Sequence, residues 1–267
     1  MAGLNPEISG TTRLFVVLGD PVAQVQAPGL LNPLFARLGA DAVLVPVHAR
    51  PGDLAEIMCG LRRIGNLDGI LVTVPHKAAV CRLADRVSPT VAVTGTANAL
   101  RREPDGTWTA DNFDGVGFVR GLAAAGHAPA GRRVSLVGTG GAGSAIAVAL
   151  LEAGVAALSL HDVDPARSTA LHARLEERWP GRAVASEEPD LSADIVVNAT
   201  PLGMRPDDPL PFPPDRLAPC RVVADIIMKP PQTRLLRESA ALGHRVHPGI
   251  HMLDRQLDSY RDFFRLD

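Results

Sequence analysis

The sequence of 267 residues predicts an α/β fold with two domains, and three observations support this prediction. Short apolar segments alternate with helical periodicity along almost the whole chain, a pattern typical of mainly parallel sheets covered by helices. Within residues 133–162, a strand, a glycine-rich turn, a helix and a second strand follow one another, as in a Rossmann-type unit. The length is sufficient for two domains of ordinary size, each with its own core.

The first half of the chain carries three predicted strands, which span residues 13–19, 42–47 and 69–74. The predicted helices between and after them span residues 28–38, 51–64 and 76–86. Pro51 suits the first turn of its helix, and Pro75 ends the third strand. A polar turn at residues 101–106 joins two short segments, residues 97–100 and 107–109, and a helix is expected at residues 116–125.

The second half is organised around the segment Gly138-Thr-Gly140-Gly141-Ala142-Gly143, between a predicted strand at residues 133–137 and a small-residue helix at 144–154. Gly138 permits a tight turn, Gly140 lets the backbone approach a pyrophosphate, and Gly143 allows close packing of helix on strand. The start of the helix, with Gly141 and Ala142, offers N–H groups and a positive dipole end to phosphates.

Asp162 follows a second predicted strand, residues 157–160, at a position where an acid binds the ribose hydroxyls of adenosine. Because strand, turn, helix, strand and acid agree, we predict a dinucleotide-binding site. A glycine-rich turn in a fold without a cofactor is the alternative.

Two further helices are expected at residues 232–242 and 250–264, after a proline-rich irregular loop at 206–219. We therefore expect a substrate-binding and catalytic domain at residues 1–113, completed by residues 243–267, and a Rossmann-type dinucleotide-binding domain at residues 114–242. Ligands of such sheets lie at the carboxyl ends of the strands, so the active site is expected in the cleft between the domains.

Composition excludes several classes of protein. A formal net charge of −2 offers no electrostatic basis for binding nucleic acid or an anionic membrane. No apolar run is long enough to span a bilayer, and the first ten residues lack a signal-peptide core. The three cysteines are scattered and lack metal-ligand spacing, which favours a reducing compartment and no metal site. We expect a cytoplasmic protein, either a monomer or a homodimer, with a small molecule as its partner.

Lysine is rare in this chain: of 27 basic residues, two are lysines, Lys77 and Lys229. Arginine cannot lose its proton in a protein, whereas lysine can be tuned into a base. Because the other basic residues of the chain are arginines, the use of lysine at these two positions indicates a functional role for both.

Five further segments carry a resemblance to one family. They are Thr73-Val-Pro-His-Lys77, Gly95-Thr-Ala-Asn98-Ala-Leu100, Asp111-Asn-Phe-Asp114-Gly-Val-Gly-Phe118, Asn198-Ala-Thr200-Pro-Leu-Gly-Met204 and Gly249-Ile-His-Met-Leu-Asp-Arg-Gln256. In order and spacing they resemble the motifs of the shikimate dehydrogenase family, and the resemblance spans almost the whole chain. It implies that Thr73, Asn98 and Gln256 bind substrate hydroxyls and that Thr200 and Gly249 lie in the cofactor site.

The resemblance also implies that Lys77 and Asp114 handle a proton while hydride passes between a substrate alcohol and nicotinamide. A positioned acid or base contributes roughly 10²–10⁴-fold to such a reaction. Free lysine, with a pKa of about 10.4, is a poor base at neutral pH, so it acts either as a base with a depressed pKa or mainly as a proton donor to the carbonyl. The structural alternatives are a surface charge for Lys77 and a helix cap for Asp114.

The chain departs from the family at the end of the pocket that binds the shikimate carboxylate. Val25 and Ala27 stand where the family has two serines, Leu71 replaces an asparagine and Met228 replaces a tyrosine. Each hydrogen bond to a charged group contributes about 1.5–3 kcal/mol, so shikimate should bind weakly unless other groups replace them. Candidate replacements are Gln24, Gln26 and Lys229.

The cofactor prediction favours NAD. NADP-using members of the family end the second dinucleotide strand with Asn-Arg-Thr, whereas this chain has His161-Asp162-Val163-Asp164 there. An acid repels the 2′-phosphate of NADP. Binding of that phosphate by Arg167 is the alternative that would allow NADP as the cofactor.

We expect an alcohol dehydrogenase for shikimate, quinate or a related cyclic polyhydroxy acid. A dinucleotide-binding sensor or scaffold without turnover is the alternative, and the retention of Lys77 and Asp114 argues against it.

Overall fold

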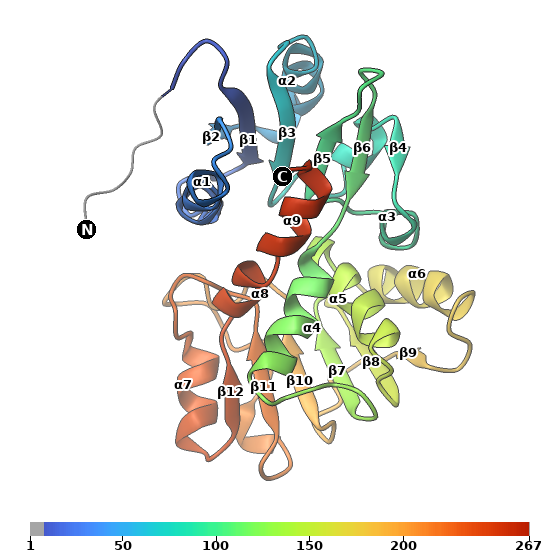
Figure 1. Cartoon of the computed structure of the whole chain (residues 1–267). Coiled ribbons are helices and arrows are strands. Elements are labelled where there is room, and N and C mark those ends of the chain that lie inside the picture. Colours follow the sequence, from blue (N-terminus) through green and yellow to red (C-terminus); the bar gives the residue numbers. More distant parts are fainter. Residues whose placement is uncertain (1–7, 267) are drawn as a thin grey trace. The chain divides into compact units, whose positions relative to one another are not determined.

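The first of two sheets is mixed. The computed structural model describes residues 8–266, and its first sheet has the strand order β2-β1-β3-β5-β6-β4 (Figure 1). Its strands are β1 (Arg13–Gly19), β2 (Ala42–His48), β3 (Leu67–Val72), β4 (Arg86–Val87), β5 (Ala99–Arg102) and β6 (Trp108–Asp111). Strands β1, β2 and β3 pair in parallel, whereas β5 is antiparallel to both β3 and β6. The short polar turn between β5 and β6 allows this hairpin, because antiparallel strands need no crossover.

Helices cover both faces of this sheet. The helical elements are α1 (Ala27–Leu38), η1 (Pro51–Asp53), α2 (Leu54–Leu61), η2 (Val80–Leu83), α3 (Pro89–Thr94) and α9 (Leu257–Phe264). Alternate residues of β1 point to opposite faces, as the period of a strand requires. Val16 and Leu18 belong to a core cluster with residues of α2. Phe15 and Val17 belong to a second cluster, which contains residues of α1 and α9.

Two helical expectations were wrong in detail. Residues 76–86, expected as one helix, form a turn, the short η2 and β4. The carbonyl of Lys77 accepts the N–H of Ala97 at 2.8 Å, which ties this backbone to a distant segment instead of a continuous helix. Residues 250–264 form two helices, α8 (Ile250–Asp254) and α9, and the break leaves Gln256 buried at the start of α9.

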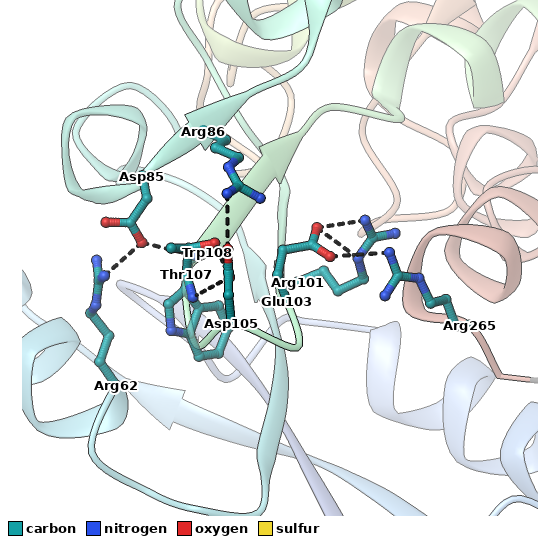
Figure 2. A network of polar contacts seen from close by, with 9 residues as sticks. All are labelled: Arg62, Asp85, Arg86, Arg101, Glu103, Asp105, Thr107, Trp108 and Arg265. Atoms are coloured by element: carbon teal, nitrogen blue, oxygen red, sulfur yellow. Dashed lines mark hydrogen bonds and ion pairs between the residues drawn. The ribbon is translucent and has the colours of Figure 1, made fainter.

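An ion-pair network attaches α9 to the β5–β6 hairpin (Figure 2). Glu103 accepts hydrogen bonds from Arg101 at 2.6 Å and from Arg265, just beyond α9, at 3.0 Å. Arg101 also donates to the carbonyl of Phe263 at 2.5 Å. Burial acts to raise the pKa of Glu103, but the hydrogen bonds from Arg101 and Thr109 and the charges of Arg101 and Arg265 together outweigh it and hold the pKa below its usual value. The C-terminal helix is therefore fastened to the first sheet by charged groups as well as by its apolar face.

The second sheet is entirely parallel, with the strand order β12-β11-β10-β7-β8-β9 (Figure 1). Its strands are β7 (Arg133–Val137), β8 (Ala157–His161), β9 (Ala183–Ala185), β10 (Ile195–Asn198), β11 (Val222–Asp225) and β12 (Arg245–His247). The accompanying helices are α4 (Asp114–Ala124), α5 (Gly141–Glu152), α6 (Pro165–Glu176), η3 (Pro214–Arg216), α7 (Arg234–Ala241) and α8. This is the strand order of a dinucleotide-binding Rossmann sheet, with the reversal between β7 and β10. The predicted Rossmann-type architecture is confirmed.

The chain divides into one unit of residues 1–113 and 256–267 and a second unit of residues 114–255. We expected residues 243–267 to complete the first domain, but residues 243–255 belong to the second unit. The reason is that β12 pairs in parallel with β11 and α8 packs on α4. Residues 1–7 of the N-terminal segment and residue 267 lie outside the described residues. No helix in residues 8–266 meets the length and hydropathy that crossing a membrane requires.

A buried histidine in the second unit has an unusual environment. His247, at the end of β12, is 1% exposed, and its Nε2 atom has no hydrogen-bond partner within residues 8–266. Its ring lies 5.1 Å from that of His251 and 6.3 Å from that of His127. Burial lowers the pKa of His247 from 6.5 to about 4, and the charges of these two histidines act in the same direction. Burial lowers the pKa of His127 as well, and the charges of Arg245 and Arg132 act in the same direction.

We predict that this histidine makes the second unit sensitive to acid. A lowered native pKa means that the unfolded chain takes up the proton first, so stability is complete above about pH 6.5 and falls as the pH decreases toward 4. The shift corresponds to at most about 3 kcal/mol. Chemical unfolding at pH 7.5 and 4.5 should show a smaller acid-induced loss for His247→Leu than for the parent and for the exposed-site control His48→Gln. Equal losses in all three proteins would contradict this origin.

Candidate active site

One edge of the first sheet gathers most of the predicted substrate residues. The parallel strands β1, β2 and β3 end at this edge, and the antiparallel β5 begins there, because Leu71 pairs with Ala99. Thr73 follows β3 directly, and Asn98 precedes β5. Carboxyl ends of parallel strands are the usual place for ligands in such sheets. The topology of the first unit thus places Thr73 and Asn98 side by side, at the same end of the paired strands β3 and β5.

A buried hydrogen-bonded cluster connects Asn98 with α9. Asn98, Gln256 and Tyr260 are 3%, 1% and 3% exposed. The Asn98 Nδ2 atom donates to Gln256 Oε1 at 3.3 Å and to the Tyr260 hydroxyl at 3.2 Å, while the Tyr260 hydroxyl donates to Gln256 Oε1 at 2.5 Å. The Asn98 Oδ1 atom accepts the N–H of Phe113 at 3.0 Å. Two donors on Gln256 Oε1 orient the amide so that its NH₂ group faces away from this pair.

Sequence reasoning missed Tyr260. It is the one tyrosine of the chain and stands four residues after Gln256 on the same helix, so the two side chains share a face. Both facts were signals that could have identified it. Its ring also packs edge-on against Phe113 at 5.5 Å, which joins the polar cluster to the apolar core.

Lys77 lies half-buried in the turn after β3. The backbone of this turn is held at both sides: the carbonyl of Lys77 accepts from Ala97, next to Asn98, and the N–H of Thr73 donates to the carbonyl of Leu18 at 2.9 Å. His76 is 1% exposed, and its Nε2 atom hydrogen-bonds the carbonyl of Ala49 at 2.7 Å. The buried side chain of His76 therefore holds the backbone of this turn in place and so positions the neighbouring lysine.

The segment between β1 and α1 is apolar where the family has serines. Val25 and Ala27 belong to the same core cluster as Leu71. Gln26 donates its side-chain amide to the carbonyl of Gln24 at 2.9 Å and so stabilises the loop itself. Gln24 is half-buried.

In the second unit, the glycine-rich turn joins β7 to α5. Gly138 has a φ of 98°, a conformation that favours glycine. A Cβ atom at Gly143 would lie 2.0 Å from the carbonyl oxygen of Gly138, so the helix can start this close to the strand only with glycine there. A Cβ atom at Gly140 would meet nothing within 4 Å. Gly141 and Ala142 form the half-buried start of α5, and no side chain caps the helix at Gly140.

The carboxylate of Asp162 is hydrogen-bonded within this turn. Its Oδ2 atom accepts the N–H of Thr139 at 2.7 Å and the Thr139 hydroxyl at 2.9 Å, and its Oδ1 atom accepts the N–H of Asp164 at 3.0 Å. Burial acts to raise the pKa of Asp162, but these hydrogen bonds outweigh it and lower the pKa. Asp162 is therefore an ionised anchor of the glycine-rich turn, a role that the sequence did not reveal. Val163 beside it is 89% exposed, and Arg167 pairs with Asp164 at 3.4 Å.

A second buried polar network fixes the loops after β10 and β11. Asn198 and Asp225 are fully buried, and Asn198 Nδ2 donates to Asp225 Oδ1 at 3.1 Å. The Thr200 hydroxyl donates to Asn198 Oδ1 at 2.7 Å, and Thr233, which sequence reasoning missed, donates to Asp225 at 2.7 Å. Burial raises the pKa of Asp225 in spite of these hydrogen bonds. A Cβ atom at Gly249 would lie 2.4 Å from the Ile226 carbonyl, so the start of α8 can lie this close to the loop after β11 only with glycine there.

The remaining predicted residues of the second unit lie in separate places. Asp114 is the first residue of α4 and is 3% exposed. Met228 is half-buried in the loop after β11, and Lys229 beside it is exposed. In residues 8–266, no group of three or more histidine, cysteine and acidic side chains is arranged to hold a metal ion.

We predict opposite outcomes for two glycine substitutions in the dinucleotide turn. Gly143→Ala should destabilise the protein by about 1–3 kcal/mol, because its methyl group meets backbone that cannot move away easily. Gly140→Ala should retain the parental melting temperature and weaken NAD binding at least tenfold, because its methyl group stands where the pyrophosphate is expected. Thermal unfolding and calorimetric titration with NAD measure both. A Gly143→Ala protein as stable as Gly140→Ala would contradict this packing.

Comparisons with known proteins agree with this arrangement. Residues 17–100 match the shikimate dehydrogenase substrate binding domain. A shikimate dehydrogenase (NADP(+)) of Rubrobacter xylanophilus is 40% identical over 255 residues, 93% of this chain and 89% of the relative. A quinate dehydrogenase of Corynebacterium glutamicum, solved with NAD, has a TM-score of 0.83 at 28% identity and covers 96% of this chain and 93% of its own. A 5-ketofructose reductase of Gluconobacter sp. strain CHM43 has a TM-score of 0.82 at 28% identity, with coverages of 95% and 92%. The chain therefore belongs to the shikimate dehydrogenase family and is a nicotinamide-dependent dehydrogenase.

Proposed function

We propose that this enzyme favours NAD and transfers hydride between the cofactor and a secondary alcohol of shikimate, quinate or a related cyclic polyhydroxy compound. The observation that carries the proposal is the buried cluster of Asn98, Gln256 and Tyr260, on the same sheet edge as Thr73. Neutral amide and hydroxyl groups of this kind suit the recognition of several substrate hydroxyls. Two of the solved relatives are named for quinate and 5-ketofructose, which supports a range of substrates on this fold.

In this proposal Lys77 and Asp114 form the proton-transfer pair. The nicotinamide, when bound, accepts or supplies the hydride. The amine of Lys77 takes the proton from the substrate alcohol in the oxidative direction and returns it to the carbonyl oxygen in the reductive direction. Asp114 orients the amine. Asn98, Gln256 and Thr73 hold the substrate hydroxyls, so that the reacting oxygen lies within hydrogen-bond reach of the lysine.

We predict that Lys77→Ala lowers kcat by roughly 10²–10⁴-fold, because the lost interaction acts in the transition state. Arg63→Ala removes an exposed basic side chain of the same unit and serves as the control, for which kcat should stay close to the parental value. Steady-state kinetics with the best substrate, together with NAD titration of each variant, test this. A Lys77→Ala enzyme with kcat within a few-fold of the parent would exclude this lysine as the proton-transfer group.

The cofactor preference rests on the end of β8. The curated relative is named for NADP(+), whereas the quinate dehydrogenase was solved with NAD. In this chain the exposed position next to Asp162 is Val163 instead of the arginine of the family's NADP users. Asp162 is ionised, and a carboxylate about 4 Å from a 2′-phosphate costs about 4 kcal/mol at an effective dielectric constant of 20. Even after screening halves this figure, more than tenfold discrimination against NADP remains.

We predict that kcat/KM with NAD exceeds that with NADP by tenfold or more. The combined change Asp162→Asn, Val163→Arg and Asp164→Thr should reverse the preference, because it removes two carboxylates and adds a phosphate-binding guanidinium. Asparagine keeps an acceptor for Thr139, and threonine can still cap α6, whose cap is now Asp164. The single change Asp164→Thr serves as the control for stability. Equal use of both cofactors by the parent would contradict the assignment.

A further inference from the structure

We infer that the preferred substrate is uncharged: a polyhydroxylated alcohol or ketone without a carboxylate at the end of the pocket where the family binds one. The inference rests on the proposed dehydrogenase function and concerns the chemistry of the same site. It arises from what surrounds the substituted positions in the folded first unit, which the sequence alone did not show.

The three substituted positions of the first unit belong to one apolar core cluster. Val25, Ala27 and Leu71 come from the β1–α1 segment, α1 and β3, yet they belong to one hydrophobic cluster. Ala27 is 8% exposed and Leu71 is 3% exposed. Phe113 and Tyr260 continue the same cluster. A carboxylate placed against this apolar cluster would lose hydration without gaining a partner, whereas a hydroxyl, a hydroxymethyl group or an ester would lose much less.

The charged groups on this sheet do not compensate for the missing serines. Asp20, the residue directly after β1, is itself an acid and pairs with His48 at 2.8 Å. Arg13 begins β1 and Arg101 lies toward the far end of β5, so both are at the opposite edge, where Asp68 and Glu103 are their partners. Arg50 is exposed after β2, two strands away from Leu71 and about 10 Å across the sheet.

The polar groups at the other end of this site are neutral. Asn98, Gln256 and Tyr260 offer amide and hydroxyl groups, and their mutual hydrogen bonds fix the orientation of the two amides. Such groups match hydroxyls and a carbonyl and provide no balancing charge for an anion. Apart from Lys77, which the proposed function assigns to the reacting oxygen, the site of the first unit therefore combines a neutral polar end with an apolar end, as an uncharged polyol requires.

The test compares acids with their methyl esters on the full-length enzyme. Shikimate and methyl shikimate, and quinate and methyl quinate, have the same ring and hydroxyl groups and differ in the charge at one end. With NAD as cofactor, we expect kcat/KM for each ester to exceed that for the acid by tenfold or more. The difference should lie mainly in KM, because the carboxylate is distant from the reacting carbon.

A variant that restores the family residues provides the converse test. The combined change Val25→Ser, Ala27→Ser and Leu71→Asn should raise kcat/KM for shikimate at least tenfold and reduce the preference for the ester. Val22→Ser changes a half-buried residue of the same loop and serves as the control, with an unchanged ratio. If the triple variant is unstable, Val25→Ser alone should shift the ratio in the same direction.

The outcomes separate the two proposals. A parent enzyme that uses the acids as well as or better than the esters would overturn the inference and leave the dehydrogenase function intact. Oxidation of none of the four compounds would contradict the proposed function and the inference with it. A preference for the esters that the family residues reduce, but that Val22→Ser does not, supports both.

Discussion

The attachment of α9 to the first sheet is the constraint on which the substrate site depends. This helix comes from the far end of the chain, and its residues Tyr260 and Phe264 complete the apolar cluster over β1 and β3. Glu103 and its two arginines hold the end of the helix, while Gln256 and Tyr260 meet Asn98 at its start. Without the helix, the Asn98 Nδ2 group would lose its hydrogen bonds to Gln256 and Tyr260, which is costly for a buried amide. Apolar packing, ion pairs and hydrogen bonds therefore all stabilise the same position of α9 on the first sheet.

In the second unit, buried side-chain hydrogen bonds likewise stabilise the turn and the loops of the candidate cofactor site. Asp162 is first of all a structural residue of the glycine-rich turn, because both oxygens of its carboxylate accept hydrogen bonds from Thr139 and Asp164. The same residue thus stabilises the turn and sets the charge next to the expected ribose. Asn198 and Asp225 play the corresponding structural part for the loops after β10 and β11. Such preorganisation allows the turn to meet a pyrophosphate without a further ordering cost.

Within the first unit, the two ends of the candidate site differ in chemistry. The end formed by Asn98 and Gln256 is polar, buried and internally hydrogen-bonded, and the end formed by Val25, Ala27 and Leu71 merges with the core. Under the proposed function, the fold keeps Lys77 and Asp114 and changes its substrate through a few positions of one apolar cluster. The change from serine to apolar residues also adds to the core, so that stability and specificity alter together.

The sequence by itself determined the fold class, the Rossmann-type unit and the family resemblance, because glycine spacing, strand periodicity and local motifs are short-range properties. It also located Lys77 and the glycine-rich turn. Only the tertiary structure decided that residues 76–86 do not form a helix, that residues 243–255 belong with the second sheet, and that Tyr260 joins Asn98. Each depends on groups far apart in the chain, such as the Ala97 N–H on the Lys77 carbonyl, and local periodicity carries no information about such partners.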